Sequence, residues 1–125
     1  GDIAAFTKPE NGREDITQAP DFGNSLRRAL KNYMPFTSLS LDITAEIIGI
    51  KPRTLQRYLK KSGVTYQEII EQLRYETALP LLHDTQQNIL EIALELGYSD
   101  AAHFSRAFRR WAGMSPREYR RRHAA

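Results

Sequence analysis

The feature that most constrains the fold is an internal repeat, because the chain carries one helix-turn-helix pattern twice, about 48–50 residues apart. Each copy has an alanine followed four residues later by a glycine, Ala45–Gly49 and Ala93–Gly97. A small side chain lets two helices cross closely, and glycine adopts the left-handed conformation of a sharp helix exit at no steric cost. The other matched positions include Leu41 and Ile89, Ile48 and Leu96, Leu55 and Phe104, Arg57 and Arg106, Lys60 and Arg109, Gly63 and Gly113, and Glu68 and Glu118.

Apolar residues recur at helical spacing from residue 22 onward, and no alternating strand pattern appears. We therefore predict an all-α fold of about seven helices, forming two helix-turn-helix subdomains joined by a long connecting helix. Pro35 is expected to stop the first helix. The predicted segments are a flexible linker or tail over 1–20 and a domain over 21–125, with the first motif at about 40–62, the connecting helix at about 65–83 and the second motif at about 88–112.

Pro80 lies inside the apolar repeat of the connecting helix. A proline there removes a backbone hydrogen bond and clashes with the carbonyl four residues earlier, at a cost of about 3 kcal/mol unless the helix bends or ends. We expect a kink or a break near Leu79.

Polar residues mark several helix starts. Thr65 with Glu68, Asn88 with Glu91 and Ser115 with Glu118 have the spacing of capping boxes, and Pro116 occupies the favoured first helical position. Leu55 in the first copy and Phe104 in the second should anchor the second helix of the motif from beneath. Ile50 and Tyr98 should fill the angle between the two helices of each motif.

Two further expectations concern particular side chains. Phe104, Phe108 and Trp111 stand at helical spacing and are predicted to be core residues. Arg74, in an acidic stretch with Glu71 and Glu76, is more typical of a structural ion-pair or hydrogen-bond residue than of a DNA contact.

The composition limits the class of protein. With 125 residues, 41% hydrophobic and 26% charged, the chain is typical of one globular domain. It contains no cysteine, which excludes disulfides and thiolate metal clusters, and it has no apolar run of the roughly 20 residues that a membrane span needs. We expect a reducing, cytoplasmic setting. A chain that begins with Gly1 is consistent with a fragment whose upstream partner domain lies outside this sequence.

Charge is strongly segregated although the net charge is only +3. Residues 24–61 carry eight basic and two acidic side chains, and residues 101–125 carry seven basic and one acidic. The stretch between them, 62–100, has the opposite balance, with one basic and seven acidic side chains. Such blocks create local positive potential. The acidic faces within 68–95 should point away from a polyanion and offer a surface to a protein partner.

The second helix of each copy carries the side chains that duplex DNA favours. An α-helix fits the major groove, where Arg can bond guanine and Gln can bond adenine in bidentate fashion, while Lys and Arg suit phosphates. The polar sets are Lys51, Arg53, Thr54, Gln56, Arg57, Lys60 and Lys61 in the first copy, and Ala102, His103, Ser105, Arg106, Arg109 and Arg110 in the second.

Two other classes of function remain as alternatives. A helical protein–protein interaction module could use the same basic faces to dock an acidic partner. An enzyme is disfavoured, because the sequence shows no Ser/His/Asp grouping, no glycine loop for phosphates and no metal-ligand spacing among His83, His103 and His123. We expect neither a cofactor nor a metal.

Residues 24–122 resemble the DNA-binding domain of the AraC/XylS family of bacterial transcription regulators. The resemblance is carried by Glu91-Ile92-Ala93, by 96–100 (Leu-Gly-Tyr-Ser-Asp), by 103–110 (His-Phe-Ser-Arg-Ala-Phe-Arg-Arg), by 113–120 (Gly-Met-Ser-Pro-Arg-Glu-Tyr-Arg) and, in the first copy, by 52–57 (Pro-Arg-Thr-Leu-Gln-Arg).

This resemblance implies that both recognition helices enter successive major grooves on one face of a duplex. It implies base-edge contacts from Arg53, Gln56 and Arg57, and from Ala101, Ala102, His103, Ser105 and Arg106. It also implies transcription activation through RNA polymerase, gated by an N-terminal effector or dimerisation domain, in a bacterial, nucleoid-associated protein.

The expected phosphate contacts are Lys51, Thr54, Lys60, Lys61, Arg109 and Arg110. For Arg120, Arg121 and Arg122, phosphate contact and a solvated basic tail both stay open.

The chain departs from the family pattern at three places. Lys51 stands where the family often has a capping serine, which predicts a less firmly started first recognition helix. Ala101 and Ala102 are too short to hydrogen-bond bases, although methyl contact with thymine is available to them. Pro80 interrupts a helix that the family usually continues.

Overall fold

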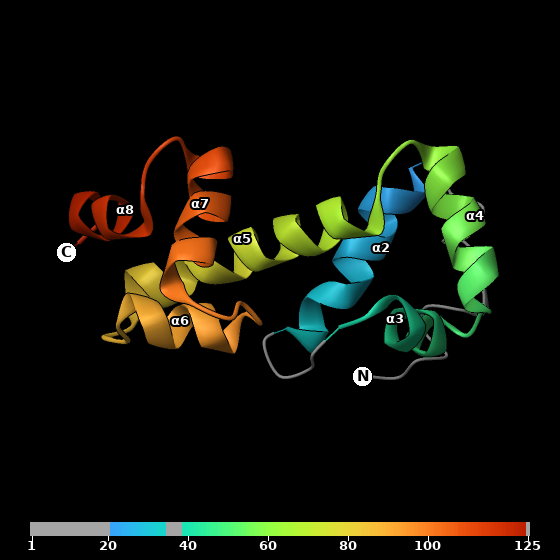
Figure 1. The fold of residues 1–125 in the computed structure, drawn as a ribbon, viewed down its shortest axis with the longest axis horizontal. Helices are drawn as coiled ribbons and strands as arrows, with labels where there is room; N and C mark the ends of the chain where they lie inside the picture. The colour runs from blue at the N-terminus through green and yellow to red at the C-terminus, as the bar shows by residue number, and fades with distance from the viewer. Residues whose placement is uncertain (1–20, 35–38, 125) are drawn as a thin grey trace, which may run out of the picture. The chain divides into compact units, whose positions relative to one another are not determined.

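The computed structural model describes residues 21–34 and 39–124. Within these ranges the protein contains seven α-helices, one short 3-10 helix and no strand, which confirms the predicted all-α class (Figure 1). The helices are α2 (Phe22–Leu30), α3 (Leu41–Ile48), α4 (Pro52–Ser62), α5 (Tyr66–Asp84), α6 (Ile89–Glu95), α7 (Ala101–Ala112) and α8 (Pro116–Arg122), with the 3-10 helix η2 at Lys31–Tyr33. The tail over 1–20 and the expected stop at Pro35 lie outside the described residues.

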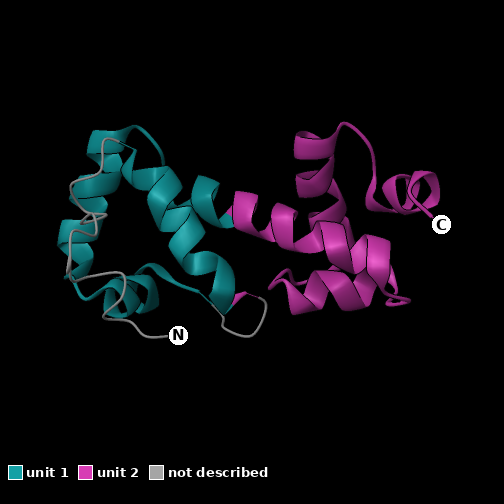
Figure 2. Ribbon diagram, turned by 180° about the vertical axis from the view of Figure 1, so that it is seen from behind, with its two compact units in different colours: residues 1–33, 39–70 teal, residues 34–38, 71–125 magenta. Residues whose placement is uncertain are grey.

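The chain divides into two compact units, 1–33 with 39–70 and 34–38 with 71–125 (Figure 2). Each described unit contains one helix-turn-helix pair, α3 with α4 in the first and α6 with α7 in the second. Helix α5 begins in the first unit and continues into the second. No helix of the described ranges is long and apolar enough to cross a membrane.

The first unit buries the apolar faces of α2, α3 and α4 against one another. Leu26, Ile48 and Leu55 are completely buried, and the Phe22 ring meets the Tyr58 ring edge-on at 5.6 Å. Thr44 is a buried polar residue whose hydroxyl bonds the phenolic oxygen of Tyr66 at 2.7 Å. Burial of a hydroxyl is favourable only when it is hydrogen-bonded, as here.

The second unit has a continuous core drawn from α5, α6 and α7. Leu82, Ile92, Phe104 and Phe108 lie at its centre, and Tyr119 of α8 packs against it. Tyr98 is buried between α6 and α7 as expected, whereas its counterpart Ile50 is only half-buried.

The predicted caps are present. Thr65 and Glu68 form reciprocal hydrogen bonds, as do Asn88 and Glu91, which completes two capping boxes. The Ser115 hydroxyl accepts from the backbone N–H of Glu118. Lys51 starts α4 without a side-chain cap, in agreement with the expectation of a less firm start.

The connecting helix does not break near Leu79, because α5 runs uninterrupted across Pro80. A kink at that place stays a prediction. Pro80 is exposed, whereas Ala78 and Leu82 on either side of it are buried in the core of the second unit. Burial of this flanking apolar surface offsets the cost of the missing backbone hydrogen bond.

The expectation that Trp111 belongs to the core is also wrong, since 40% of its surface remains exposed. Trp111 lies in the last turn of α7, and its indole stacks on the ring of Tyr75 at 5.9 Å. Helical spacing placed Trp111 on the apolar face of α7, but the buried part of that face ends at Phe108, one turn earlier.

Gly97 combines a left-handed backbone with a close neighbour. Its φ is 99°, and a Cβ atom there would lie 3.1 Å from the guanidinium of Arg74. That guanidinium sits 4.7 Å from the centre of the Tyr98 ring, so Arg74 packs within the protein through a cation–π contact. Gly113 has a similar φ of 77° but open space around its Cα.

We predict that Gly113→Ala lowers the free energy of unfolding by about 1–2 kcal/mol, the usual cost of a left-handed non-glycine residue. Gly97→Ala should cost about 1 kcal/mol more, because Arg74 must also move from its packed position. Urea unfolding of the two variants measures the difference. Equal losses would show that the Arg74 contact does not restrict position 97.

Candidate nucleic-acid interface

Helix α4 presents one polar face and buries the other. Leu55 and Leu59 are buried, while Arg53, Arg57 and Lys60 are all exposed. These three residues are spaced i, i+4 and i+7, so at about 100° per residue they form one line along the helix opposite the two leucines. Gln56 and Lys61 flank the line and are exposed; Thr54 is half-buried, and Lys51 is exposed at the N-cap.

Helix α7 repeats this arrangement at equivalent positions. Phe104, Ala107 and Phe108 are buried. The exposed line consists of Ala102, Arg106 and Arg109, which the repeat aligns with Arg53, Arg57 and Lys60. The first position of the line thus carries a methyl group in α7 and a guanidinium in α4.

The remaining predicted site residues of α7 surround its first turns. Ala101 and Ser105 are half-buried, and His103 is exposed with its ring edge against Tyr98 at 5.3 Å. The backbone N–H of His103 donates to the Asp100 carboxylate at 2.7 Å, which caps the helix. Asp100 was not among the predicted caps, although an Asp before a helical apolar pattern is a usual signal.

Arg110 lies at the end of α7 and has a partner within the protein. Its guanidinium donates to both carboxylate oxygens of Glu71, at 2.6 and 3.3 Å, and the Trp111 indole N–H donates to the same carboxylate at 2.7 Å. The Arg110 hydrogen bond is the main reason why the pKa of Glu71 lies below its usual value, against the opposing effect of burial. The expected phosphate contact of Arg110 would require its guanidinium to leave Glu71.

Arg120, for which phosphate contact and a solvated basic tail were both left open, has a structural role. Its guanidinium donates to the backbone carbonyls of Leu81, Leu82, Thr85 and Gln87, at and just beyond the C-terminus of α5. Four carbonyls at a helix end lack intrahelical partners, and a cation there is also favoured by the helix dipole. The usable signal was that α5 ends without a glycine, so that its carbonyls need another donor.

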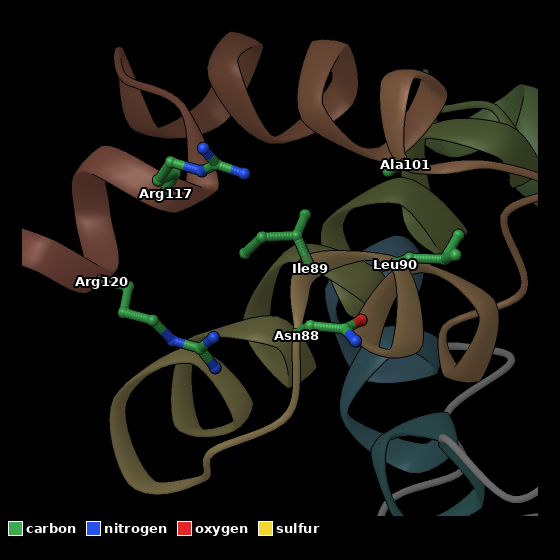
Figure 3. A pocket seen from close by; sticks show the side chains of 6 residues that line it. All are labelled: Asn88, Ile89, Leu90, Ala101, Arg117 and Arg120. Atoms are coloured by element: carbon green, nitrogen blue, oxygen red, sulfur yellow. The ribbon is translucent and has the colours of Figure 1, made fainter.

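Helices α6 and α8 border a surface hollow of about 470 Å³ in the second unit (Figure 3). Asn88, Ile89, Leu90 and Ala101 line it together with Arg117 and Arg120 of α8. Leu90 is about half exposed there. The lining contains no acid or histidine that could act as a catalytic base or metal ligand.

The structure also brings together two histidines that are distant in sequence. The rings of His83 and His123 lie 6.2 Å apart, with Tyr119 stacked on His123 at 4.0 Å. Residues 21–34 and 39–124 nevertheless contain no group of three His, Asp or Glu side chains placed to hold a metal ion.

We predict that Arg120→Met lowers the free energy of unfolding by about 2 kcal/mol, because hydrogen bonds from a charged group to partly buried carbonyls are lost. Arg121→Met, at an exposed neighbouring position, should change it by less than about 0.5 kcal/mol. Thermal or urea unfolding compares them. If the two variants are equally stable, Arg120 is not the cap of α5.

Comparison with known proteins bears directly on these two helix-turn-helix units. Residues 44–122 match the family model described as a helix-turn-helix domain. The chain is 41% identical over 80 residues to the ornithine utilization regulator of Pseudomonas aeruginosa, covering 64% of this chain and 24% of that protein. It is 39% identical over 83 residues to the transcriptional activator RhaS of an Enterobacter species, covering 66% and 30%.

Solved structures share the fold. A Chromobacterium violaceum transcriptional regulator with an AraC-type DNA-binding domain superposes with a TM-score of 0.66 at 29% identity, covering 78% of this chain and 88% of that one. The DNA-binding domain of AdpA, solved in complex with a target DNA, superposes with a TM-score of 0.63 at 22% identity, covering 80% and 90%.

The fold and the matched residues define a helix-turn-helix DNA-binding domain. More particularly, the chain belongs to the AraC family of DNA-binding transcriptional regulators, as the resemblance predicted, and activators are among its relatives. Such a regulator works in the compartment that holds bacterial DNA, which implies the cytoplasm. The chain spans about a quarter of the length of the first curated relatives.

Proposed function

We propose that this domain binds a specific duplex site by placing α4 and α7 in successive major grooves. The observation that carries the proposal is the pair of equivalent exposed lines, Arg53–Arg57–Lys60 and Ala102–Arg106–Arg109, each opposite a buried apolar face. A helix with polar groups on its outer side can present several of them to base edges at once.

The proposed contacts fall into two sets. Long side chains with paired donors or acceptors read base edges, and these are Arg53, Gln56, Arg57 and Arg106. Ala101, Ala102, His103 and Ser105 lie at the start of α7, where they contribute shorter-range base contacts. The phosphate set is Lys51, Thr54, Lys60, Lys61 and Arg109. Arg110 is left out of this set because Glu71 holds its guanidinium.

A titration of duplex DNA at several salt concentrations tests the proposal. With about five phosphate contacts, log K should fall with log salt at a slope of about −4 to −5. No binding, or a flat slope, would instead favour a helical module that docks an acidic protein.

We predict that Arg57→Ala and Arg106→Ala each cost about 1–3 kcal/mol in binding and relax preference at one base position, because a bidentate base contact is lost. Lys60→Ala should weaken binding to all duplex sequences equally and make the slope of log K against log salt shallower by about 1. Arg28→Ala, which removes an exposed charge from α2, is the control. Selection from a random duplex library measures the preference. If Arg57→Ala selects the same sites as the unchanged domain, its base-contact role is wrong.

We further propose that the longer protein activates transcription in the bacterial nucleoid by contacting RNA polymerase, under an N-terminal effector or dimerisation domain. The Enterobacter relative is a transcriptional activator, which supports this proposal. We expect purified full-length protein to raise transcript yield from a promoter carrying the selected site with RNA polymerase alone. A lower yield would identify a repressor.

A further inference from the structure

Glu71 connects α5 to the last turn of α7 through one carboxylate. That carboxylate accepts from two nitrogens of Arg110 and from the indole of Trp111, so two consecutive residues share it. The Glu71 side chain is 29% exposed and the Arg110 side chain 57%, so the ion pair sits at the surface rather than in the core. Tyr75, one turn further along α5, stacks on the indole ring with the ring centres 5.9 Å apart.

The other cations of the two polar faces have different surroundings. Arg106 and Arg109 are exposed, and neither forms a hydrogen bond or ion pair within residues 21–34 and 39–124. Lys61, which the repeat aligns with Arg110, is likewise exposed and makes no ion pair with a described residue. The two copies therefore differ at this position, because only the second copy's cation has a carboxylate against it.

The geometry of the pair favours its persistence beside DNA. Two N–H groups of one guanidinium facing two oxygens of one carboxylate form the strongest common ion-pair arrangement in proteins. A phosphate would have to replace Glu71 at both positions, and the released carboxylate would then add negative charge near the DNA backbone.

We infer that Glu71 is a positioning residue that withholds Arg110 from the phosphate backbone and holds the end of α7 through Trp111. This inference rests on the proposed function. The second recognition helix then makes one phosphate contact fewer than its sequence suggests, and Glu71 sets the salt dependence of binding.

The test compares salt slopes of duplex binding. Arg110→Ala should leave the slope unchanged, whereas Arg109→Ala should make it shallower by about 0.9, the value of one contact. Glu71→Gln keeps an acceptor for the Trp111 indole but removes the charge, so the freed Arg110 should steepen the slope by about 0.9. Because of the extra phosphate contact, Glu71→Gln should bind the duplex more tightly than the unchanged domain at 50 mM salt. The ratio of the two affinities should fall about 3-fold between 50 and 200 mM salt. The double variant Glu71→Gln/Arg110→Ala should return to the original slope.

Two controls separate this effect from general charge and from misfolding. Glu46→Gln removes an exposed carboxylate from α3 and should leave the slope unchanged. Trp111 is the single tryptophan of the chain, so its fluorescence reports the contact in the free protein. The emission should be kept in Glu71→Gln and shift to the red in Glu71→Ala, which leaves the indole N–H without its acceptor.

Three results would overturn the inference: equal flattening by Arg109→Ala and Arg110→Ala, an unchanged slope in Glu71→Gln, or the same steepening in Glu46→Gln. Failure of the proposed function has a different signature, since the unchanged domain itself would then show no salt-dependent duplex binding, and the inference would fall with it.

Discussion

Burial of a narrow apolar stripe on each second helix is the interaction on which the rest of the molecule depends. In α4 this stripe is Leu55 with Leu59, and in α7 it is Phe104 with Phe108. Once these side chains are packed inward, helical geometry alone directs the residues on the opposite side into solvent. The guanidinium groups of Arg57 and Arg106 are exposed for that reason, with no further contact needed to hold them there.

Much of the fold was predictable because its signals are local. Periodicity gave the all-α class, and the spacing of Asn88 with Glu91 predicted a capping box that is present. Likewise, the outer faces of α4 and α7 followed from the same periodicity that placed Leu55 and Phe104 inside. Which of the outward residues meet bases stays a prediction, because it depends on a duplex that no pattern in the chain describes.

The misses at Arg120, Trp111 and Pro80 concern long-range packing, whereas the missed Asp100 cap was a local signal. The role of Arg120 depends on carbonyls more than thirty positions earlier, and the place of Trp111 depends on where the core of the second unit ends. Pro80 shows the same limit, since its local penalty was assessed correctly but the burial of Ala78 and Leu82 outweighs it. Local rules identify the cost of such a residue, and tertiary packing determines whether that cost changes the structure.

The repeat has a consequence for how a domain of this kind changes over evolutionary time. Position 102 is exposed and carries only a methyl group, whereas its counterpart Arg53 carries a full-length cation. A longer residue at 102 would project into solvent and leave Phe104 and Phe108 undisturbed. One copy can therefore drift toward a new target while the other preserves the old attachment, so that altered recognition does not require passing through a form that binds nothing.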